Sequence, residues 1–458
     1  MKEFTLQKYY RWQIGVVVVI LLSTISCKEE GGTSPVDDVT RPFTNIPSTK
    51  DIVMYEVNFR AFSQTGDFNG VTQKLDHIKS LGVNVLWLMP IYPIGMVNTV
   101  NSPYCVRDYK GINPEFGTVS DFKGLVNESH KRNIAVIIDW VANHTSWDNI
   151  WMKNKSWYTQ DAQGNIIIPP GTNWQDVAEL NYDNDTMRLA MIDAMKYWVM
   201  DMNIDGFRCD AADYVPTDFW TQAIDTLNNI LDRKLILLAE GSKSEQFLAG
   251  FHMNYAWDFF GAIKNVYVNS YSASTLFAVH SQEYSNIPIG KYKLRFTTNH
   301  DESAWNATPV GMFGGLKSSF SAFVITTCLG GVPLVYGSQE VGISNKISFF
   351  SKNPIDWTKN PDLLSEYQKL LTAYSSSELL RTGTLQSFSN TDIVAFRKNL
   401  DNEEALILVN VRSKSVLYSL PASIQNSSWT SVFDGSEVNL ATTLQFNAFD
   451  YFVLINSR

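Results

Sequence analysis

Gly206-Phe207-Arg208-Cys209-Asp210-Ala211-Ala212 is the stretch that decides how this chain folds. It places an arginine two residues before an aspartate at the end of an apolar run. In an extended strand, residues i and i+2 point to the same side, so Arg208 and Asp210 are predicted to face one pocket. A guanidinium beside a carboxylate favours the charged form and lowers its pKa. An aspartate kept ionised in this way can act as a nucleophile, although the two residues could also form a structural ion pair.

Three other polar clusters each follow an apolar, strand-like run. They are Asp139-Trp140-Val141-Ala142-Asn143-His144 after residues 134–138, Glu240 after residues 235–239, and Asn299-His300-Asp301 after residues 294–298. Continuous apolar runs of this length suit parallel strands that are buried on both faces. Polar residues at the carboxyl ends of such strands are where a (β/α)8 barrel carries its catalytic groups. The runs therefore predict an α/β fold with a (β/α)8 TIM barrel.

The spacing of the clusters fits one barrel, in which each β/α unit takes roughly 30 residues. Asp210 and Glu240 are 30 positions apart, and Glu240 and Asp301 are 61 apart, which corresponds to one unit and two units. Asp139 and Asp210 are 71 apart, so about 40 extra residues are expected after the third strand.

Taken together, the clusters resemble the conserved regions of the α-amylase family of glycoside hydrolases. Asp139 to His144 resembles the first region, Gly206 to Ala211 the second, Glu240 the third and Asn299 to Asp301 the fourth. Further matches in the family's order are residues 82–90, Tyr104, Asp108-Tyr109, Phe116-Gly117, Gly331-Val332-Pro333 and Tyr336-Gly337. The resemblance runs from about residue 50 to the C-terminus.

The resemblance implies a catalytic role for three carboxylates. Asp210 is the expected nucleophile of a retaining glycosidase, and Glu240 is its general acid and then its general base. Asp301 is expected to bind sugar hydroxyls and to stabilise the oxocarbenium-like transition state. The nearby carboxylates are expected to raise the pKa of Glu240.

The resemblance also implies substrate-binding roles for Tyr104, His144, Arg208 and His300. Tyr104 is expected to stack on the apolar face of the sugar, and the two histidines to hydrogen-bond the same sugar. Asp139 is expected to orient the neighbourhood of Arg208. Either histidine alone is more often a structural residue, and Tyr104 alone could belong to the core. Their occurrence together with all four clusters favours the functional interpretation.

The chain is expected to divide into several parts. The catalytic barrel is predicted over residues 46–380, with a small inserted domain at about 143–183, after the third strand. Beyond residue 380, short alternating apolar runs between turn residues predict a C-terminal antiparallel β-sandwich domain over residues 381–458.

The N-terminal residues predict export and a lipid anchor. Residues 1–26 combine a basic start with an apolar run that is too short to span a membrane, the pattern of a signal peptide. Cys27 follows a small residue, as in a bacterial lipoprotein box, although Thr24 stands where leucine is usual. Lys28-Glu29-Glu30 resembles the export tag of surface lipoproteins in Bacteroidetes-type bacteria. Residues 27–45 predict a flexible tether.

The expected location is therefore the outer membrane or cell surface of a Gram-negative bacterium, through the lipid on Cys27. A secreted or periplasmic protein is the alternative. The net charge of −9, without a clustered basic stretch, argues against a nucleic-acid partner. The other cysteines, Cys105, Cys209 and Cys328, are too few and too widely spaced for a disulfide framework or a zinc pattern.

Two departures from the family pattern bear on specificity and on calcium. Many members have Lys-His three and four residues after the nucleophile, where this chain has Asp213-Tyr214, so the leaving-group subsite is expected to differ. That histidine usually helps to hold calcium. Asn143 and Asp176 are oxygen donors of the kind that Ca²⁺ prefers, so a calcium site stays open, with a solvated turn as the equal alternative for Asp176. Ala211, where strict 1,6-glucosidases tend to have valine, favours α-1,4 bonds.

The expected activity is thus retaining hydrolysis of α-1,4-glucosidic bonds in starch-type α-glucans or maltooligosaccharides. An α-glucan transglycosylase or an α-glucosidase of the same family is the close alternative. A non-catalytic glucan-binding protein is the alternative of another class, against which the intact Arg208, Asp210, Glu240 and Asp301 argue.

Overall fold

The structure is a computed structural model that describes residues 41–388 and 390–457. The predicted signal peptide, the lipidation site Cys27 and the first part of the predicted tether lie outside the described residues. Within the part that is described, no helix is both long and apolar enough to cross a membrane.

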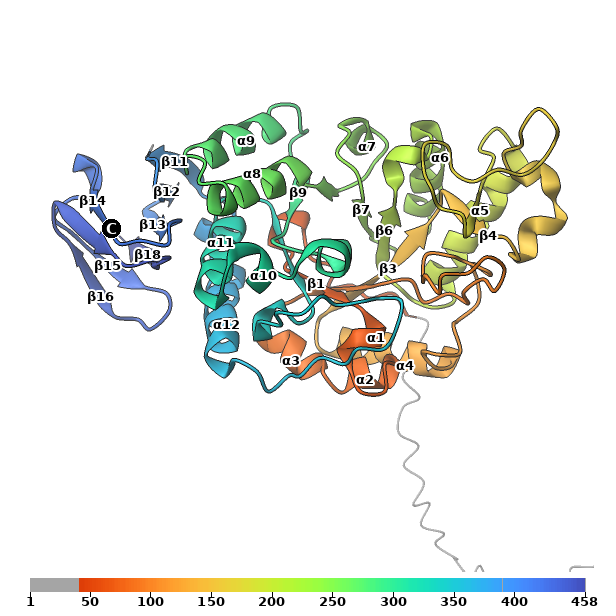
Figure 1. The fold of residues 1–458 in the computed structure, drawn as a ribbon, viewed down its shortest axis with the longest axis horizontal. Coiled ribbons are helices and arrows are strands. Elements are labelled where there is room, and N and C mark those ends of the chain that lie inside the picture. The colour runs from red at the N-terminus through yellow and green to blue at the C-terminus, as the bar shows by residue number, and fades with distance from the viewer. Residues whose placement is uncertain (1–40, 389, 458) are drawn as a thin grey trace, which may run out of the picture. The chain divides into compact units, whose positions relative to one another are not determined.

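Eight parallel strands close into a barrel, as the sequence predicted (Figure 1). Around the barrel they follow the order β1-β10-β9-β8-β7-β6-β3-β2. The strands are β1 (Met54–Val57), β2 (Val85–Leu88), β3 (Ala135–Val141), β6 (Gly206–Asp210), β7 (Ile236–Ala239), β8 (Met253–Tyr255), β9 (Tyr292–Arg295) and β10 (Val332–Tyr336). In chain order, β3, β6, β7 and β9 are the third, fourth, fifth and seventh barrel strands, so each polar cluster belongs to the unit that its spacing predicted.

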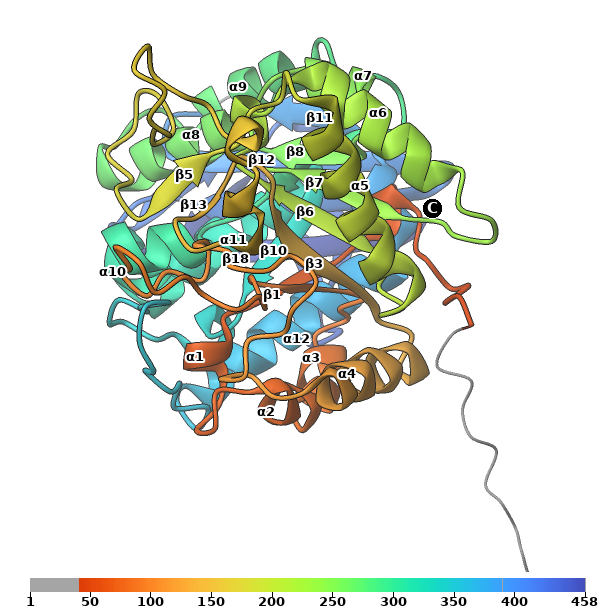
Figure 2. The same ribbon diagram turned by 90° about the vertical axis from the view of Figure 1, so that its right-hand side faces the viewer.

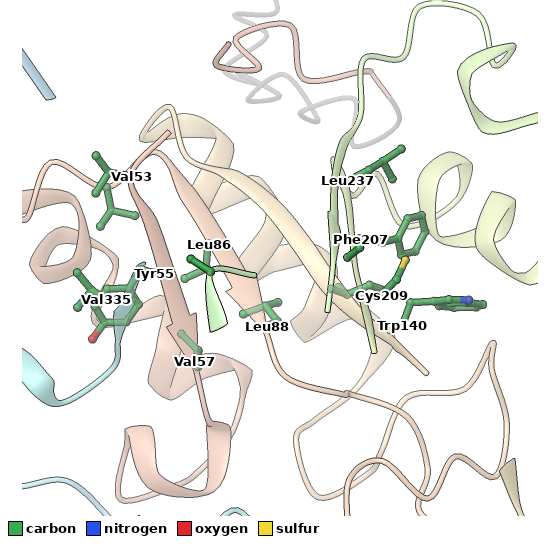
Figure 3. Packing of buried hydrophobic residues seen from close by; sticks show 14 of the residues in the cluster. Val53, Tyr55, Val57, Leu86, Leu88, Trp140, Phe207, Cys209, Leu237 and Val335 are labelled. Atoms are coloured by element: carbon green, nitrogen blue, oxygen red, sulfur yellow. The ribbon is translucent and has the colours of Figure 1, made fainter. Parts of the chain in front are cut away.

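The barrel strands are buried on both faces, which explains their nearly continuous apolar sequences. Because side chains alternate along a strand, one set fills the barrel interior and the other packs against the surrounding helices. Met54 and Trp87 belong to the inner cluster. Tyr55 and Leu86 belong to the outer cluster, part of which Figure 3 shows. Cys209 also lies in the outer cluster, as expected for a residue that packs away from Asp210.

Helices surround the strands (Figure 2). They are α1 (Phe59–Phe62), α2 (Phe68–Thr72), α3 (Leu75–Ser80), α4 (Val119–Lys131), α5 (Asp185–Met200), α6 (Thr217–Asn228), α7 (Glu245–Leu248), α8 (Trp257–Val268), α9 (Thr275–Tyr284), α10 (Pro309–Phe313), α11 (Leu316–Cys328), α12 (Pro361–Ser376) and α13 (Glu378–Thr382). Local sequence starts several of them. At α4, Thr118 and Asp121 form a capping box that satisfies the first free N–H groups of the helix.

Short elements lie in the loops around the barrel. The 3₁₀ turns are η1 (Thr49–Asp51), η2 (Ile150–Lys153), η3 (Lys155–Trp157), η4 (Ala212–Tyr214), η6 (Gln339–Val341) and η7 (Ala422–Ile424), and η5 (Glu302–Asn306) is a π-helical turn. The segment between β3 and α5 also carries an antiparallel pair, β4 (His144–Ser146) and β5 (Val177–Glu179). This segment contains the extra residues that were expected after the third strand.

The C-terminal strands form two antiparallel sheets around their own core. The strands are β11 (Thr384–Phe388), β12 (Ile393–Leu400), β13 (Glu403–Asn410), β14 (Val416–Ser419), β15 (Ser427–Ser431), β16 (Glu437–Leu440), β17 (Thr443–Phe446) and β18 (Tyr451–Ser457). One sheet has the order β11-β12-β13-β18-β15-β16, and β14 pairs with β17. Side chains from both sheets, such as Leu406 and Phe446, share one apolar cluster. The predicted C-terminal β-sandwich is therefore present.

Candidate active site

A cavity of about 950 Å³ opens among the loops that follow the barrel strands. Asp210, Glu240 and Asp301 line it, at the carboxyl ends of β6, β7 and β9. The candidate sugar-binding residues Tyr104, His144 and His300 line the same cavity, which also receives Trp174 and Asp176 from the segment between β3 and α5. The structure thus brings together carboxylates that are far apart in the sequence, at the end of the barrel where such folds carry their active sites.

One guanidinium contacts three carboxylates beneath this cavity. Arg208 Nη1 donates to Oδ1 of both Asp139 and Asp210, at 2.8 Å each, and its Nη2 lies 3.0 Å from Oε1 of Glu240. The contact with Asp210 follows from the i, i+2 relationship on β6. Asp139 stands opposite Arg208 in the register of β3 and β6, and both side chains are fully buried. Asp210 and Glu240 therefore lie close to each other, on either side of one planar group.

The pKa of Asp210 corrects one expectation from the sequence. Burial raises the pKa of Asp210 above its usual value, against the lowering effect of the charge and hydrogen bond of Arg208. The expectation that the arginine would hold this pKa low was wrong in its net direction, because it left out the cost of removing a carboxylate from water.

The pKa of Glu240 is raised, as expected, but chiefly for another reason. Burial is the largest cause, Arg208 opposes it, and the carboxylate of Asp210 adds to it. A carboxyl group with a raised pKa keeps a proton closer to neutral pH, and this property suits a general acid.

A strained backbone unit holds Glu240 in place. The N–H of Ala211 donates to Oε2 of Glu240 at 2.7 Å, and Ala211 has a left-handed backbone with φ of 45°. This conformation costs an alanine roughly 1–2 kcal/mol, and such strain gathers at functional sites. The backbone N–H of Ala212 also donates to the Glu240 carbonyl, at 2.9 Å. From the sequence, Ala211 was considered only as a sign of preference for α-1,4 bonds. Its role as a hydrogen-bond donor could not be seen there, because the donor is a backbone N–H that every residue except proline carries.

His300 is the centre of a second hydrogen-bonded group. Its Nε2 lies 2.7 Å from the Tyr104 hydroxyl and 3.3 Å from Oδ2 of Asp301, and the Tyr104 and His300 rings stack. The Tyr104 hydroxyl also donates to Oδ2 of Asp139, at 3.1 Å. On its other side, His300 contacts Glu56, a residue that sequence reasoning missed. The available signal was that Glu56 is the charged residue within the otherwise apolar or aromatic strand β1.

His144 presents a neutral ring to the cavity. Burial lowers its pKa to about 4, against the opposing effect of Asp176. Its ring centroid lies 5.5 Å from that of Trp174. The two histidines of the cavity therefore differ in charge at neutral pH, since the pKa of His300 is raised to about 9.

That Asn143 and Asp176 hold calcium stays a prediction, because their described contacts involve only backbone carbonyls and the Asn143 amide nitrogen. The side-chain amide nitrogen of Asn143 lies 3.3 Å from Nδ1 of His144. The backbone carbonyl of Asn143 accepts a hydrogen bond from the N–H of Leu180. The backbone carbonyl of Asp176 accepts a hydrogen bond from the thiol of Cys105. Among the described residues, no group of three or more histidine, cysteine or acidic side chains could hold a metal ion. Calcium also takes amide and backbone carbonyl oxygens as ligands, and the reaction steps below do not involve it.

Asp213 stands where the family pattern has lysine, and it ties together two loops of the cavity wall. Its carboxylate accepts from Nε2 of Gln246 at 2.6 Å and from the N–H of Ser242 at 3.1 Å. Lys243 donates to the Asp213 carbonyl at 2.8 Å. These contacts connect the segment after β6 to the loop that follows Glu240, and a different leaving-group subsite stays a prediction.

Comparison with known proteins agrees with this geometry. Residues 48–165 and 156–384 match the family described as "Alpha amylase, catalytic domain". Alpha-amylase 3 of Dictyoglomus thermophilum is 26% identical over 438 residues, covering 80% of this chain and 86% of that protein. Trehalose-6-phosphate hydrolase of Bacillus subtilis is 34% identical over 211 residues, covering 38% of this chain and 36% of that protein. A crystal structure of an α-amylase from Lactobacillus plantarum aligns with a TM-score of 0.81 at 28% identity, covering 89% of this chain and 99% of the other.

Proposed function

The chain belongs to the α-amylase family of glycoside hydrolases, and on this premise we propose that it cleaves α-1,4-glucosidic bonds of starch-type α-glucans or maltooligosaccharides with retention. The observation that carries the proposal is the contact of Arg208 with both Asp210 and Glu240. Two carboxyl groups that touch one guanidinium lie a few ångströms apart. Retaining glycosidases need this short separation, about 5 Å, since a wider one leaves room for a water molecule and gives inversion.

In the first step, a carboxylate oxygen of Asp210 attacks the anomeric carbon of the bound sugar. The bond from that carbon to the glycosidic oxygen breaks, and Glu240 donates its proton to the oxygen of the leaving sugar. Asp301 and the other carboxylates of the wall stabilise the positive charge that develops on the reacting sugar. The product of this step is a covalent ester between Asp210 and the sugar, together with ionised Glu240.

In the second step, ionised Glu240 takes a proton from water. The water oxygen attacks the anomeric carbon, the ester bond to Asp210 breaks, and the sugar leaves with its original configuration. Glu240 is again protonated and Asp210 is again ionised, so both groups are ready for the next bond. His300 carries a positive charge and lies beside Asp301, which supports a role for His300 in hydrogen-bonding the same sugar.

The charge of the cavity favours a neutral substrate. Five carboxylates line it, those of Asp176, Asp210, Asp213, Glu240 and Asp301. Among the described residues of the lining, none is lysine or arginine. A sugar phosphate would meet these carboxylates, and the charged histidine of the lining, His300, is buried and already paired with Glu56 and Asp301. We therefore favour an uncharged glucan over the phosphorylated disaccharide in the name of the trehalose-6-phosphate hydrolase.

A transglycosylase is the second candidate, because a sugar hydroxyl can replace water in the second step. One observation supports it: Trp174 and Tyr214, with ring centroids 6.1 Å apart, line the cavity near Asp213 and offer a stacking face to an acceptor sugar. A non-catalytic glucan-binding protein is less well supported, because the three candidate catalytic carboxylates all face one cavity.

The test is a time course of products from amylose, pullulan and maltotriose with the full-length protein. Mixed short maltooligosaccharides from amylose, with pullulan intact and the α-anomer formed first, would support a retaining α-1,4 hydrolase. Glucose as the sole product would indicate an α-glucosidase, and products longer than the substrate a transglycosylase. Absence of reducing-sugar release by folded protein would contradict the proposal and favour the binding protein.

For the location, we propose that lipid on Cys27 anchors the enzyme at the surface of a Gram-negative cell. The support is the signal-like sequence before Cys27 and the Lys28-Glu29-Glu30 tag after it. Cys27→Ser should move the protein from the membrane fraction to the soluble fraction. An unchanged distribution would exclude the anchor and leave a secreted or periplasmic protein.

A further inference from the structure

A strip of aromatic side chains leads from the candidate reaction centre along the cavity wall. His300 lies at its inner end, with its ring centroid 5.6 Å from that of Phe349. Phe349 stacks on Phe350 at 4.4 Å, and Trp305 meets Phe350 edge-on at 5.3 Å. All four residues line the same cavity. The strip is therefore continuous with the candidate site and is not a separate patch.

The exposure of the strip increases toward its outer end. Phe349 is only 2% exposed, whereas Trp305 is 59% exposed. An exposed indole beside a cavity leaves a large apolar area in water, and an apolar area of this kind at the rim of a site marks a binding surface. A pyranose ring has one face made of C–H groups and a rim of hydroxyls, so it covers an aromatic face while its hydroxyls stay hydrated.

Backbone and side-chain contacts hold Trp305 in position. It belongs to the π-helical turn η5. Such turns are rare in proteins, and those that occur are often found at functional sites. Lys346 donates to the carbonyl of Trp305 at 2.7 Å, and the N–H of Ile347 donates to the carbonyl of Ser303 at 3.0 Å. The turn is thus tied to the segment that carries Phe350. Because the turn is already ordered, binding a sugar ring there does not carry the entropic cost of ordering the platform.

The strip lies on the side of Asp301, not on the side of the general acid. Trp305 follows Asp301 by four residues within one turn, whereas Glu240 is joined through Asp213 to the wall that carries Tyr214. In the proposed reaction Glu240 protonates the leaving sugar, so the wall near Tyr214 faces the sugar units that depart. If the wall near Tyr214 takes the departing units, the wall that carries Trp305 is left for the units that remain attached to the reacting sugar.

From these contacts we propose that Trp305 and Phe350 form a platform for a glucosyl unit of the α-glucan on the side that becomes bonded to Asp210. This inference rests on the proposed function and extends it. A chain that continues beyond the reacting sugar gains contact with the platform, and a single glucosyl unit does not. The enzyme then prefers to transfer several linked glucosyl units rather than one.

The experiment uses α-glucosyl fluoride and α-maltotriosyl fluoride, in which fluoride replaces the leaving sugar. Differences between the two substrates then report only the side of the cavity that carries Trp305. Trp305→Ala should lower the ratio of kcat/KM for α-maltotriosyl fluoride over that for α-glucosyl fluoride by about tenfold, the factor that corresponds to an aromatic contact of this kind. Trp305→Phe should keep most of the ratio. Tyr271→Ala is the matched control, since Tyr271 is 54% exposed and outside the cavity lining, and it should leave the ratio unchanged.

An unchanged ratio in Trp305→Ala, or an equal fall in Tyr271→Ala, would overturn the platform. Failure of the proposed function has a different signature, namely no turnover of either fluoride by the wild-type protein. In that case calorimetric binding of maltotriose still decides: weaker binding in Trp305→Ala supports the platform, and equal binding excludes it.

Discussion

Nδ1 of His300 lies 2.5 Å from Oε1 of Glu56, although 244 positions separate the two residues in the sequence. Both side chains are buried, at 1% and 0% exposure. The contact joins the first barrel strand to the loop after the seventh, and it places a carboxylate behind the histidine that faces the cavity. Burial lowers the pKa of His300, but Asp301 and Glu56 raise it by more, to about 9.

This contact predicts how His300 titrates. Its charged form is stabilised up to about pH 9, whereas an unfolded histidine loses its proton near pH 6.5. The stabilisation is therefore fully present below pH 6.5 and is lost as the pH rises through about 9. Glu56→Gln removes a negative charge and keeps the shape. We expect the His300 titration midpoint, followed by NMR of labelled histidine, to move down toward 6.5.

Several groups other than Glu56 also face His300, and they stay unchanged in the variant. Asp301 and the Tyr104 hydroxyl contact it directly, Asp139 and Arg208 lie behind Tyr104, and Trp87 packs edge-on against its ring. Only the charge of Glu56 changes in the variant, so the other five histidines of the chain should keep their midpoints. A His300 midpoint that stays near 9 would show that Asp301 alone keeps the ring charged.

Asp210→Asn should abolish turnover and leave the fold intact. The amide cannot act as the nucleophile, and we expect kcat on amylose to fall by at least about a thousandfold. Arg208 keeps its pairing with Asp139, so the thermal midpoint should change little. Asp193→Asn is the control, because Asp193 is an exposed partner of Lys110. Near-normal turnover by Asp210→Asn would remove this residue from the mechanism.

Glu240→Gln should separate the two chemical steps. Fluoride leaves without a proton, so α-glucosyl fluoride should still react with Asp210 in this variant. The second step lacks its general base, so the covalent ester should accumulate. Mass spectrometry should then find one added glucosyl unit on the peptide that contains Asp210. The assignment of Glu240 fails if no adduct forms and the variant hydrolyses amylose at the wild-type rate.

Gly206→Ala should destabilise the barrel. Gly206 has φ of 150°, and a Cβ there would lie 1.9 Å from the carbonyl oxygen of Ile236 on the neighbouring strand. We expect the free energy of unfolding, measured with urea, to fall by at least about 2 kcal/mol. Gly124→Ala is the matched control, because Gly124 lies within α4 and its Cβ would meet no atom within 4 Å. That variant should gain about 0.5–1 kcal/mol, and equal losses in both would refute the steric account.

The sequence by itself determined where the polar clusters stand in the barrel. Each follows an apolar run, and the number of residues between them counts β/α units, so Asp210, Glu240 and Asp301 could be assigned to their strands without a structure. The contact of Arg208 with Asp210 was predictable as well, because alternation along a strand is a local property. These are features that depend on near neighbours in the chain.

Only the tertiary structure decided what surrounds those residues. Glu56 behind His300 and Phe350 beside Trp305 are contacts between segments that are distant in the sequence. The left-handed backbone of Ala211 depends on the loops packed around it. The pKa of Asp210 is raised because burial outweighs its arginine neighbour, and burial is a property of the whole assembled barrel. Local sequence sets strands and spacing, whereas solvent exclusion and long-range contact arise only when the strands close around one another.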